Sequence, residues 1–142
     1  MKKFDLLISF YFILLLLLGC NGDSNKKAIY ELREHCGKTA EQWVKAKPGE
    51  ILNYRAHYNL HFNKCFILAT LSPVVSNNFY SSFDILYDVN ENKEYGHHTS
   101  RFYQNGAPES NQCSFRGKYY GGTTGAQAEQ KWSEFVKEIM EE

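Results

Sequence analysis

Histidine side chains are the residues of this 142-residue chain best suited to metal binding or proton transfer. His57 and His61 flank a short predicted turn, and His97 and His98 are neighbours further along. Neutral imidazole binds transition metals and is a general base near neutral pH. A shared site would need His57, His61 and only one of the other pair, because neighbours on a strand point to opposite faces. No cysteine or carboxylate completes such a site, so we interpret the histidines as surface residues and predict no metal ligand.

The hydroxyl and carboxylate side chains form no catalytic motif. Nucleophilic catalysis needs a nucleophile, a base and an orienting group in contact. Ser81, Ser82 and Ser100 are present, but no nucleophile elbow surrounds them. Asp84 and Asp88 would share a strand face and have the character of ordinary solvated carboxylates. The sequence therefore predicts no catalytic residue and no cofactor.

The densest polar pattern surrounds a predicted hairpin turn. His57-Tyr58-Asn59 precedes the turn, and Asn63-Lys64-Cys65-Phe66 follows it. The side chains of Asn59 and Asn63 can hydrogen-bond the turn backbone, and Asn63 can adopt a left-handed conformation. We favour this structural role. A ligand-binding group formed by His57, Asn59 and Asn63 is the alternative.

Hydrophobic periodicity predicts a helix, then a sheet, then a second helix. Apolar stripes at steps of three and four predict helices over residues 26–46 and from about 124 to the end. Alternation predicts a half-buried strand over 51–60, and an apolar run predicts a strand over 65–71 that is covered on both faces. Further strands are predicted over 79–89, 93–103 and 113–120.

The fold expected from these elements is α+β. We predict a small antiparallel sheet of four or five strands, with the N-terminal and the C-terminal helix packed on one face. Each helix has one apolar stripe and a polar back, so each needs one covered side. A closed barrel with peripheral helices is the alternative.

Three cysteines follow Cys20, and they allow one disulfide with one thiol left over. Cys36 lies on the apolar stripe of the first predicted helix, and Cys65 begins the most apolar strand. A helix packed on that strand can bring the two Cα atoms within the roughly 4.4–6.8 Å that a disulfide needs. We therefore predict a Cys36–Cys65 disulfide, with Cys113 unpaired or paired between chains. Competition by Cys113 for either partner is the alternative.

The first twenty residues have the organisation of a bacterial export signal. Lys2 and Lys3 precede an apolar run, Leu6 to Leu18, which is too short to span a bilayer. The run ends in Leu-Leu-Gly-Cys, which resembles the lipobox of bacterial lipoproteins, although Leu18 is an unusual residue for its position. The resemblance implies cleavage before Cys20 and attachment of acyl chains such as palmitate. A plain secretory signal with a coincidental cysteine is the alternative.

These features divide the chain into three parts. Residues 1–19 would be a removed signal peptide, residues 20–27 the lipidated cysteine with a short polar tether, and residues 28–142 a single globular domain. Acyl chains on Cys20 would anchor the protein stably to a membrane. Asn21, in place of an aspartate after the cysteine, favours the periplasmic face of an outer membrane if the host is Gram-negative.

Composition restricts the partners of the mature chain. Without Lys2, Lys3 and Asp5, 14 basic and 15 acidic residues remain, a net charge of −1. No basic patch stands out, so nucleic acid is excluded as a partner. The expected partners are the membrane, through the N-terminal lipid, and a protein of the envelope.

Several short segments resemble an uncharacterised group of small exported bacterial proteins. They are Cys36, Trp43, His57-Tyr58-Asn59, Asn63-Lys64-Cys65 and Asp88-Val89-Asn90-Glu91. The resemblance covers roughly residues 36–95. It implies no activity, substrate or catalytic residue, but it suggests that Cys36 and Cys65 belong to one structural unit.

The function expected from the sequence is that of a membrane-anchored envelope lipoprotein. The anchor, the lack of a catalytic motif and the abundant aromatic residues favour a non-enzymatic binding or interaction module, of which an enzyme inhibitor is one form. The alternative is a periplasmic hydrolase or metal-binding protein that uses the histidines.

Overall fold

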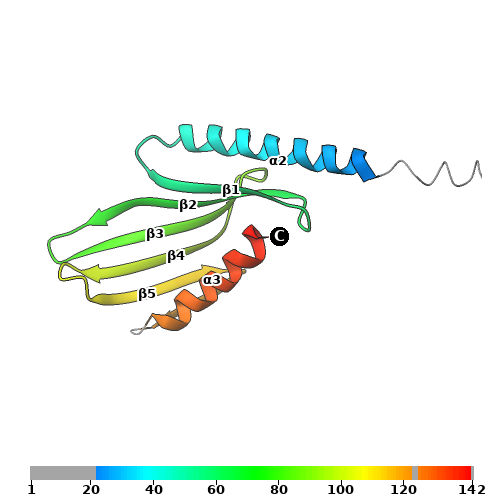
Figure 1. The fold of residues 1–142 in the computed structure, drawn as a ribbon. Coiled ribbons are helices and arrows are strands. Elements are labelled where there is room, and N and C mark those ends of the chain that lie inside the picture. Colours follow the sequence, from blue (N-terminus) through cyan, green and yellow to red (C-terminus); the bar gives the residue numbers. More distant parts are fainter. Residues whose placement is uncertain (1–21, 123–124, 142) are drawn as a thin grey trace, which may run out of the picture. The chain divides into compact units, whose positions relative to one another are not determined.

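The computed structural model describes residues 22–122 and 125–141. Its elements, in chain order, are α2 (Gly22–Lys45), β1 (Ile51–Asn59), β2 (Lys64–Val75), β3 (Phe79–Asp88), β4 (Lys93–Tyr103), β5 (Pro108–Phe115), β6 (Lys118–Gly122) and α3 (Ala126–Met140) (Figure 1). The predicted signal peptide and Cys20 lie outside the described residues. The chain separates between Glu34 and His35 into two units, and the packing discussed below belongs to the second.

The six strands form one antiparallel sheet in which the strand order equals the chain order. The α+β fold is therefore confirmed, and the sheet is open, with β1 and β6 as its edges. The sequence predicts four or five strands and the structure has six, because the single strand predicted over residues 113–120 is two strands. Arg116 and Gly117, with φ of 50° and 70°, divide this segment into β5 and β6. β5 also begins earlier than predicted, since polar residues before Cys113 pair with β4.

The part of α2 from His35 onward and helix α3 pack on opposite faces of the sheet, so the prediction that both helices cover one face is wrong. Cys65 and Ile67 of β2 contact the second half of α2, at Cys36 and Ala40. Phe66, between them, belongs to the core beneath α3. Neighbouring strand residues point to opposite faces. Because β2 is apolar on both faces, it needs a helix on each.

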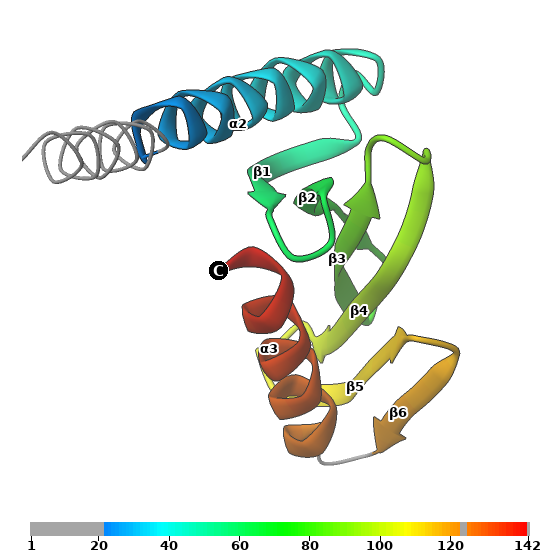
Figure 2. The ribbon, with the colours of Figure 1, turned by 90° about the vertical axis from the view of Figure 1, so that its right-hand side faces the viewer.

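Helix α3 covers the larger core. Figure 2 shows it lying across one face of the sheet. It contacts β5 and β6 near one edge of the sheet and β1 and β2 at the other edge, so the sheet curls around the helix. Its buried residues are Ala128, Trp132, Phe135, Ile139 and Met140, which are those of the predicted apolar stripe.

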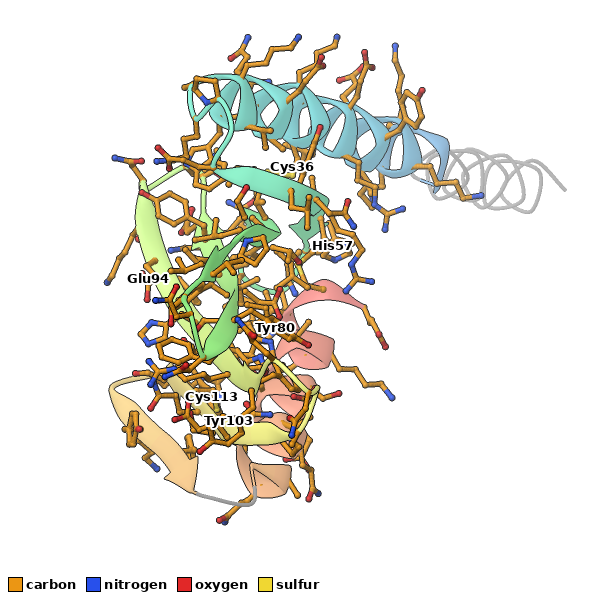
Figure 3. All side chains as sticks on the ribbon, turned by 90° about the vertical axis from the view of Figure 1, so that its left-hand side faces the viewer. Cys36, His57, Tyr80, Glu94, Tyr103 and Cys113 are labelled. Atoms are coloured by element: carbon orange, nitrogen blue, oxygen red, sulfur yellow. A yellow bond between two sulfur atoms is a disulfide. The ribbon has the colours of Figure 1, made fainter. Side chains whose placement is uncertain are left out.

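The pairing of β4 with β3 shifts by one residue at Tyr95, forming a β-bulge. The extra residue lets Tyr95 point to the α3 face, where its ring lies 4.9 Å from that of Phe66. Glu94 points to the other face, away from His57 (Figure 3). The bulge thus places an aromatic ring near the end of the sheet, beside the turn between β3 and β4.

Helix α2 is longer than the sequence predicted. It begins at Gly22, so residues 22–25, which precede the predicted helix and were expected to belong to the tether, are helical. Adding residues to an existing helix costs little, since each forms one more hydrogen bond. Its 24 residues make it about 36 Å long. Neither helix among the described residues is long and apolar enough to cross a bilayer.

Strand β1 is less buried than its alternating sequence suggested. Leu52 and Tyr54 remain 68% and 37% exposed, and Leu60, just after the strand, 46%, whereas Tyr58 is buried. Tyr58 belongs to the small cluster around the disulfide. β1 is an edge strand with a neighbour on one side only, and its pairing with β2 is irregular at its start.

Candidate functional site

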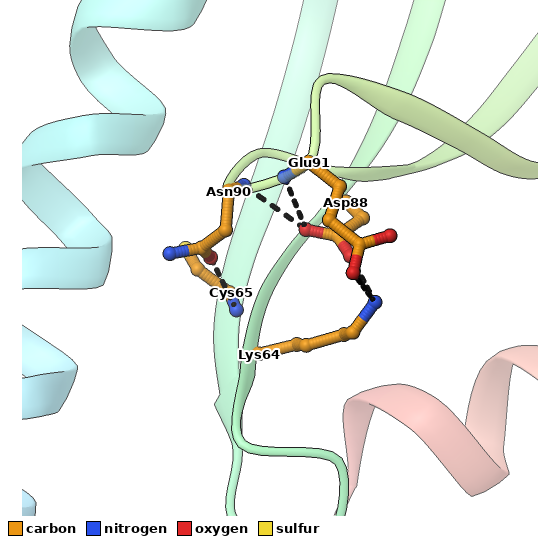
Figure 4. A network of polar contacts seen from close by, with 5 residues as sticks. All are labelled: Lys64, Cys65, Asp88, Asn90 and Glu91. Carbon is orange, nitrogen blue, oxygen red and sulfur yellow. Dashed lines mark hydrogen bonds and ion pairs between the residues drawn. The ribbon is translucent and has the colours of Figure 1, made fainter.

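An ionic network around the buried carboxylate of Asp88 joins two hairpin turns at one end of the sheet (Figure 4). Lys64 Nζ lies 2.7 Å from both Asp88 Oδ2 and Glu91 Oε1. The hydrogen bond to Asp88, and to a smaller extent that to Glu91, raises the pKa of Lys64. Asp88 is fully buried, not solvated as expected, and its Oδ1 accepts hydrogen bonds from the backbone N–H groups of Asn90 and Glu91. Asn90 Oδ1 in turn accepts the N–H of Cys65 at 2.9 Å, which ties the network to the disulfide.

The predicted Cys36–Cys65 disulfide is present, with Cα atoms 5.3 Å apart. Cys113 is a free thiol, fully buried, with Sγ 3.3 Å from the carbonyl oxygen of Ala128. Burial, helped by the negative charge of Glu129, raises the pKa of this thiol. Cys113 is therefore inaccessible to a second chain while α3 stays in place, which argues against the intermolecular disulfide considered from the sequence.

The asparagines of the β1–β2 turn have structural partners. Asn59 is fully buried; its Oδ1 accepts the N–H of Phe62 at 2.9 Å, and its Nδ2 donates to the carbonyl of Ile139 at 3.0 Å. Asn63 adopts the predicted left-handed conformation, with φ of 54°, and its side chain accepts a hydrogen bond from the Tyr58 hydroxyl. The two asparagines thus fix the turn and fasten it to the end of α3.

The structure does not bring the histidines together. His57 and His98 face the same side of the sheet but are three strands and four residues apart. Strand spacing and residue rise make this separation about 20 Å, whereas a zinc–nitrogen bond is about 2 Å. His97 points to the opposite face, and His61 lies in the β1–β2 turn with its ring against Phe62. Within the described parts of the chain, no three His, Cys, Asp or Glu side chains could hold a metal ion.

His98 instead belongs to a polar cluster beneath the first turn of α3. Its Nδ1 lies 3.6 Å from Asp84 Oδ2, and its Nε2 lies 3.2 Å from Glu129 Oε2 and hydrogen-bonds Asn111. The ring stacks on Trp132 with centroids 5.8 Å apart. Both ring nitrogens are engaged and the residue is only 4% exposed, so His98 is poorly placed to exchange a proton with a substrate.

The charges of this cluster stabilise one another. Burial opposes a charge on His98, but hydrogen bonds to Asp84 and Asn111, with the charges of Glu129 and Asp84, outweigh it and raise the His98 pKa. Burial would likewise raise the pKa of Asp84, yet hydrogen bonds from His98 and Thr70 lower it. His98 therefore links Asp84 of the sheet to Glu129 of α3, and a charge on its ring is favoured by both carboxylates.

A groove of about 440 Å³ opens at the end of the sheet where the three hairpin turns β1–β2, β3–β4 and β5–β6 lie. We call it the turn-end groove. It is lined by Phe62, Lys93, Glu94, Tyr95, Arg116 and Gly117. No two of these turns are adjacent in sequence, so the groove exists only when the sheet is formed. Its residues were not among the candidates predicted from the sequence.

Arg116 has an unusual backbone for its residue type. Arg116 and Gly117 both have positive φ, as the two-residue turn of a tight hairpin requires. Glycine and asparagine adopt this conformation readily, but arginine does not. The Arg116 guanidinium pairs with Glu138 and lies 5.4 Å from the centre of the Phe135 ring, both on α3. Helix α3 therefore holds this cation at the wall of the groove.

Of the other charged lining residues, Lys93 points to the α3 face of the sheet, as Tyr95 does, whereas Glu94 points to the opposite face. Lys93 makes no ion pair with any residue that the structure describes. The acidic lining residue, Glu94, has its Oε1 2.6 Å from His97 Nδ1. Lys64 lies near the Tyr95 ring but pairs with both Asp88 and Glu91, so it adds no excess positive charge. The arrangement can bind a negatively charged group next to aromatic rings.

Comparison of the chain with protein-family models, curated proteins and solved structures finds no match.

Proposed function

We propose that this chain is a lipid-anchored protein of the bacterial cell envelope that binds a partner in the turn-end groove without catalysing a reaction. An inhibitor that occupies an envelope enzyme is one form of such a module. The lipobox-like sequence before Cys20 supports the anchor. The Cys36–Cys65 disulfide is consistent with export, since disulfides persist mainly in oxidising compartments.

The observation that carries the binding proposal is a groove whose walls are fixed by buried groups. Asn59 holds the turn that contributes Phe62, and Asp88 holds the turn that precedes Lys93. Sites with walls that are already ordered lose less entropy on binding. The histidine-dependent hydrolase is not favoured, because His98 is engaged on both ring nitrogens and His57 lies far away.

The anchor is tested by replacing Cys20 with serine in the full chain. We expect the native chain to incorporate radiolabelled palmitate and to sediment with membranes, and Cys20→Ser to do neither. Asn21 supports an outer-membrane position on the periplasmic face in a Gram-negative host, and density-gradient fractionation measures it. Palmitate labelling that survives the substitution would exclude Cys20 as the lipid site.

The binding site is tested by photo-crosslinking in intact cells. A benzoyl-phenylalanine in place of Phe62 puts the reactive group in the groove. The matched control replaces Tyr119, which is 67% exposed and lies on the other face of the sheet. We expect a defined adduct from the position of Phe62 that is absent from the position of Tyr119. The same adducts from both positions, or none from Phe62, would contradict a partner in the groove.

A further inference from the structure

We infer that the turn-end groove recognises a single carboxylate attached to a planar apolar group, an inference that rests on the proposed binding function. An aromatic acid carries this chemistry, and so does a protein chain that ends in an aromatic residue. The inference combines the aromatic rings, the cations and the charge balance of the lining.

The aromatic rings supply the surface for the planar group. Phe62 and Tyr95 line the groove, and both meet Phe66 edge to face, with ring centroids 6.1 Å and 4.9 Å away. Phe66 is itself fully buried, so the two rings are supported from the core. Aromatic rings favour edge-to-face or offset contacts with a further ring.

Stability alone does not explain an arginine at position 116. The left-handed backbone is unfavourable for a non-glycine residue. An exposed ion pair such as that with Glu138 and an exposed cation–π contact such as that with Phe135 each stabilise the fold only weakly. These contributions nearly cancel, so the guanidinium brings the fold no clear advantage over asparagine. Strained backbone at such a position points to a role for the side chain in function.

The cations on the α3 face suit a monoanion. Arg116 is neutralised by Glu138, but its planar fork has five N–H donors and one ion pair leaves others free. Lys93, on the same face, has no ion pair with a residue that the structure describes. One such ammonium beside a guanidinium fork matches one carboxylate. A phosphate dianion would carry excess negative charge next to Glu138.

The test measures binding of small probes to the purified chain, kept in detergent so that an N-terminal lipid is retained. N-acetyl-phenylalanine carries the proposed groups, N-acetyl-phenylalaninamide lacks the charge, and acetate lacks the ring. Benzoate represents a free aromatic acid, and inorganic phosphate a dianion. ¹H–¹⁵N NMR spectra report saturable shifts at Tyr95 and Gly117. We expect the acid to bind about tenfold more tightly than its amide, acetate or phosphate.

Variants separate binding from folding. Lys93→Gln should weaken acid binding about tenfold. Arg116→Asn should do the same while suiting the turn better than arginine, so lost binding there is not unfolding. The matched control is Lys47→Gln, since Lys47 lies 5.1 Å from the Trp43 ring in a smaller pocket on the opposite face. It should leave binding unchanged.

The outcomes are distinguishable. Equal binding of acid and amide, tighter binding of phosphate, or an equal loss in Lys47→Gln would overturn the ligand class. If photo-crosslinking from Phe62 finds a partner but none of the probes binds, the ligand class is wrong and the binding function stands. If benzoate binds more weakly than N-acetyl-phenylalanine, the ligand is a chain end and not a free aromatic acid.

Discussion

Replacing Gly96 with alanine should loosen α3 from the sheet. A Cβ atom at this position would lie 2.8 Å from Phe115 Cβ, 2.9 Å from Ser114 O and 3.1 Å from Phe135 Cε1. The first two atoms are fixed to the backbone of β5, so a side-chain rotation cannot remove the clash. Relief requires β4 to move from β5 or α3 to move from the sheet.

The cost follows from what such a movement breaks. Overpacking a core costs about 1–3 kcal/mol. The rings of Phe115 and Phe135 stack with centroids 4.2 Å apart directly at this point, so their contact is disturbed as well. We therefore expect Gly96→Ala to lower the free energy of unfolding by about 2–3 kcal/mol, within the upper part of that range. The melting temperature should fall by roughly 10 °C.

Urea unfolding followed by circular dichroism measures this effect. Gly37→Ala is the matched control, because Gly37 lies within α2 and its new Cβ would meet no atom within 4 Å. That change should stabilise the chain by up to about 1 kcal/mol, from helix propensity alone. A loss below about 0.5 kcal/mol for Gly96→Ala, with an unchanged urea slope, would refute the packing described at this glycine.

Three further predictions use the same unfolding assay. Replacing Cys36 and Cys65 together with alanine should cost about 3–4 kcal/mol, the chain-entropy value for their separation of 29 residues; a change below about 1 kcal/mol would contradict it. The pKa of His98 is raised above its usual 6.5 in the folded chain. The stability that its charge contributes is therefore fully present below pH 6.5 and is lost as pH rises through the folded pKa. The pKa of Asp84 is lowered below its usual 3.8, so the stability that its charge contributes is lost as pH falls through the folded pKa. NMR titration checks both values, and His98→Gln should abolish the alkaline loss. Asn59→Ala should cost about 2–4 kcal/mol, since it leaves buried backbone groups of the β1–β2 turn and α3 without partners; a change near zero would contradict their burial.

The disulfide and the order of helices and strands could be predicted because both depend on patterns of residues close together in the sequence. Cys36 lies on a helical apolar stripe, and Cys65 starts an apolar strand, so packing of one element on the other suffices to place the pair. The left-handed backbone of Asn63 is also a local property of residue type. Each of these predictions needs only neighbouring residues.

The division of the helices between two faces was implied by the sequence but not deduced. The apolar run over 65–71 was correctly predicted to be covered on both faces. A sheet this small has two helices to supply that cover, so one helix had to lie on each face. The β5–β6 turn was not predicted because Arg116 occupies its first position, and arginine is not a residue that indicates a tight turn.

The polar cluster and the groove could not be predicted from local patterns. His98 meets Asp84 only when the register of β3 on β4 is known, and Glu129 arrives from a helix that follows two further strands. Phe62 and Arg116 lie in turns that the chain brings together only after the whole sheet has formed. Long-range register, which the sequence does not state, determines both sites.

The order of the cysteines along the chain bears on how the disulfide would form in the exported protein that we propose. A chain that crosses a membrane with its N-terminus first would deliver Cys36, then Cys65, and last Cys113 to the oxidising side. Cys20 would carry lipid and offer no free thiol. The native bond joins the first two of the remaining thiols, which would emerge before β4, β5 and α3. An oxidase that links cysteines in order of appearance would therefore make the correct bond directly, and Cys113 would afterwards be enclosed beneath α3 without need of an isomerase.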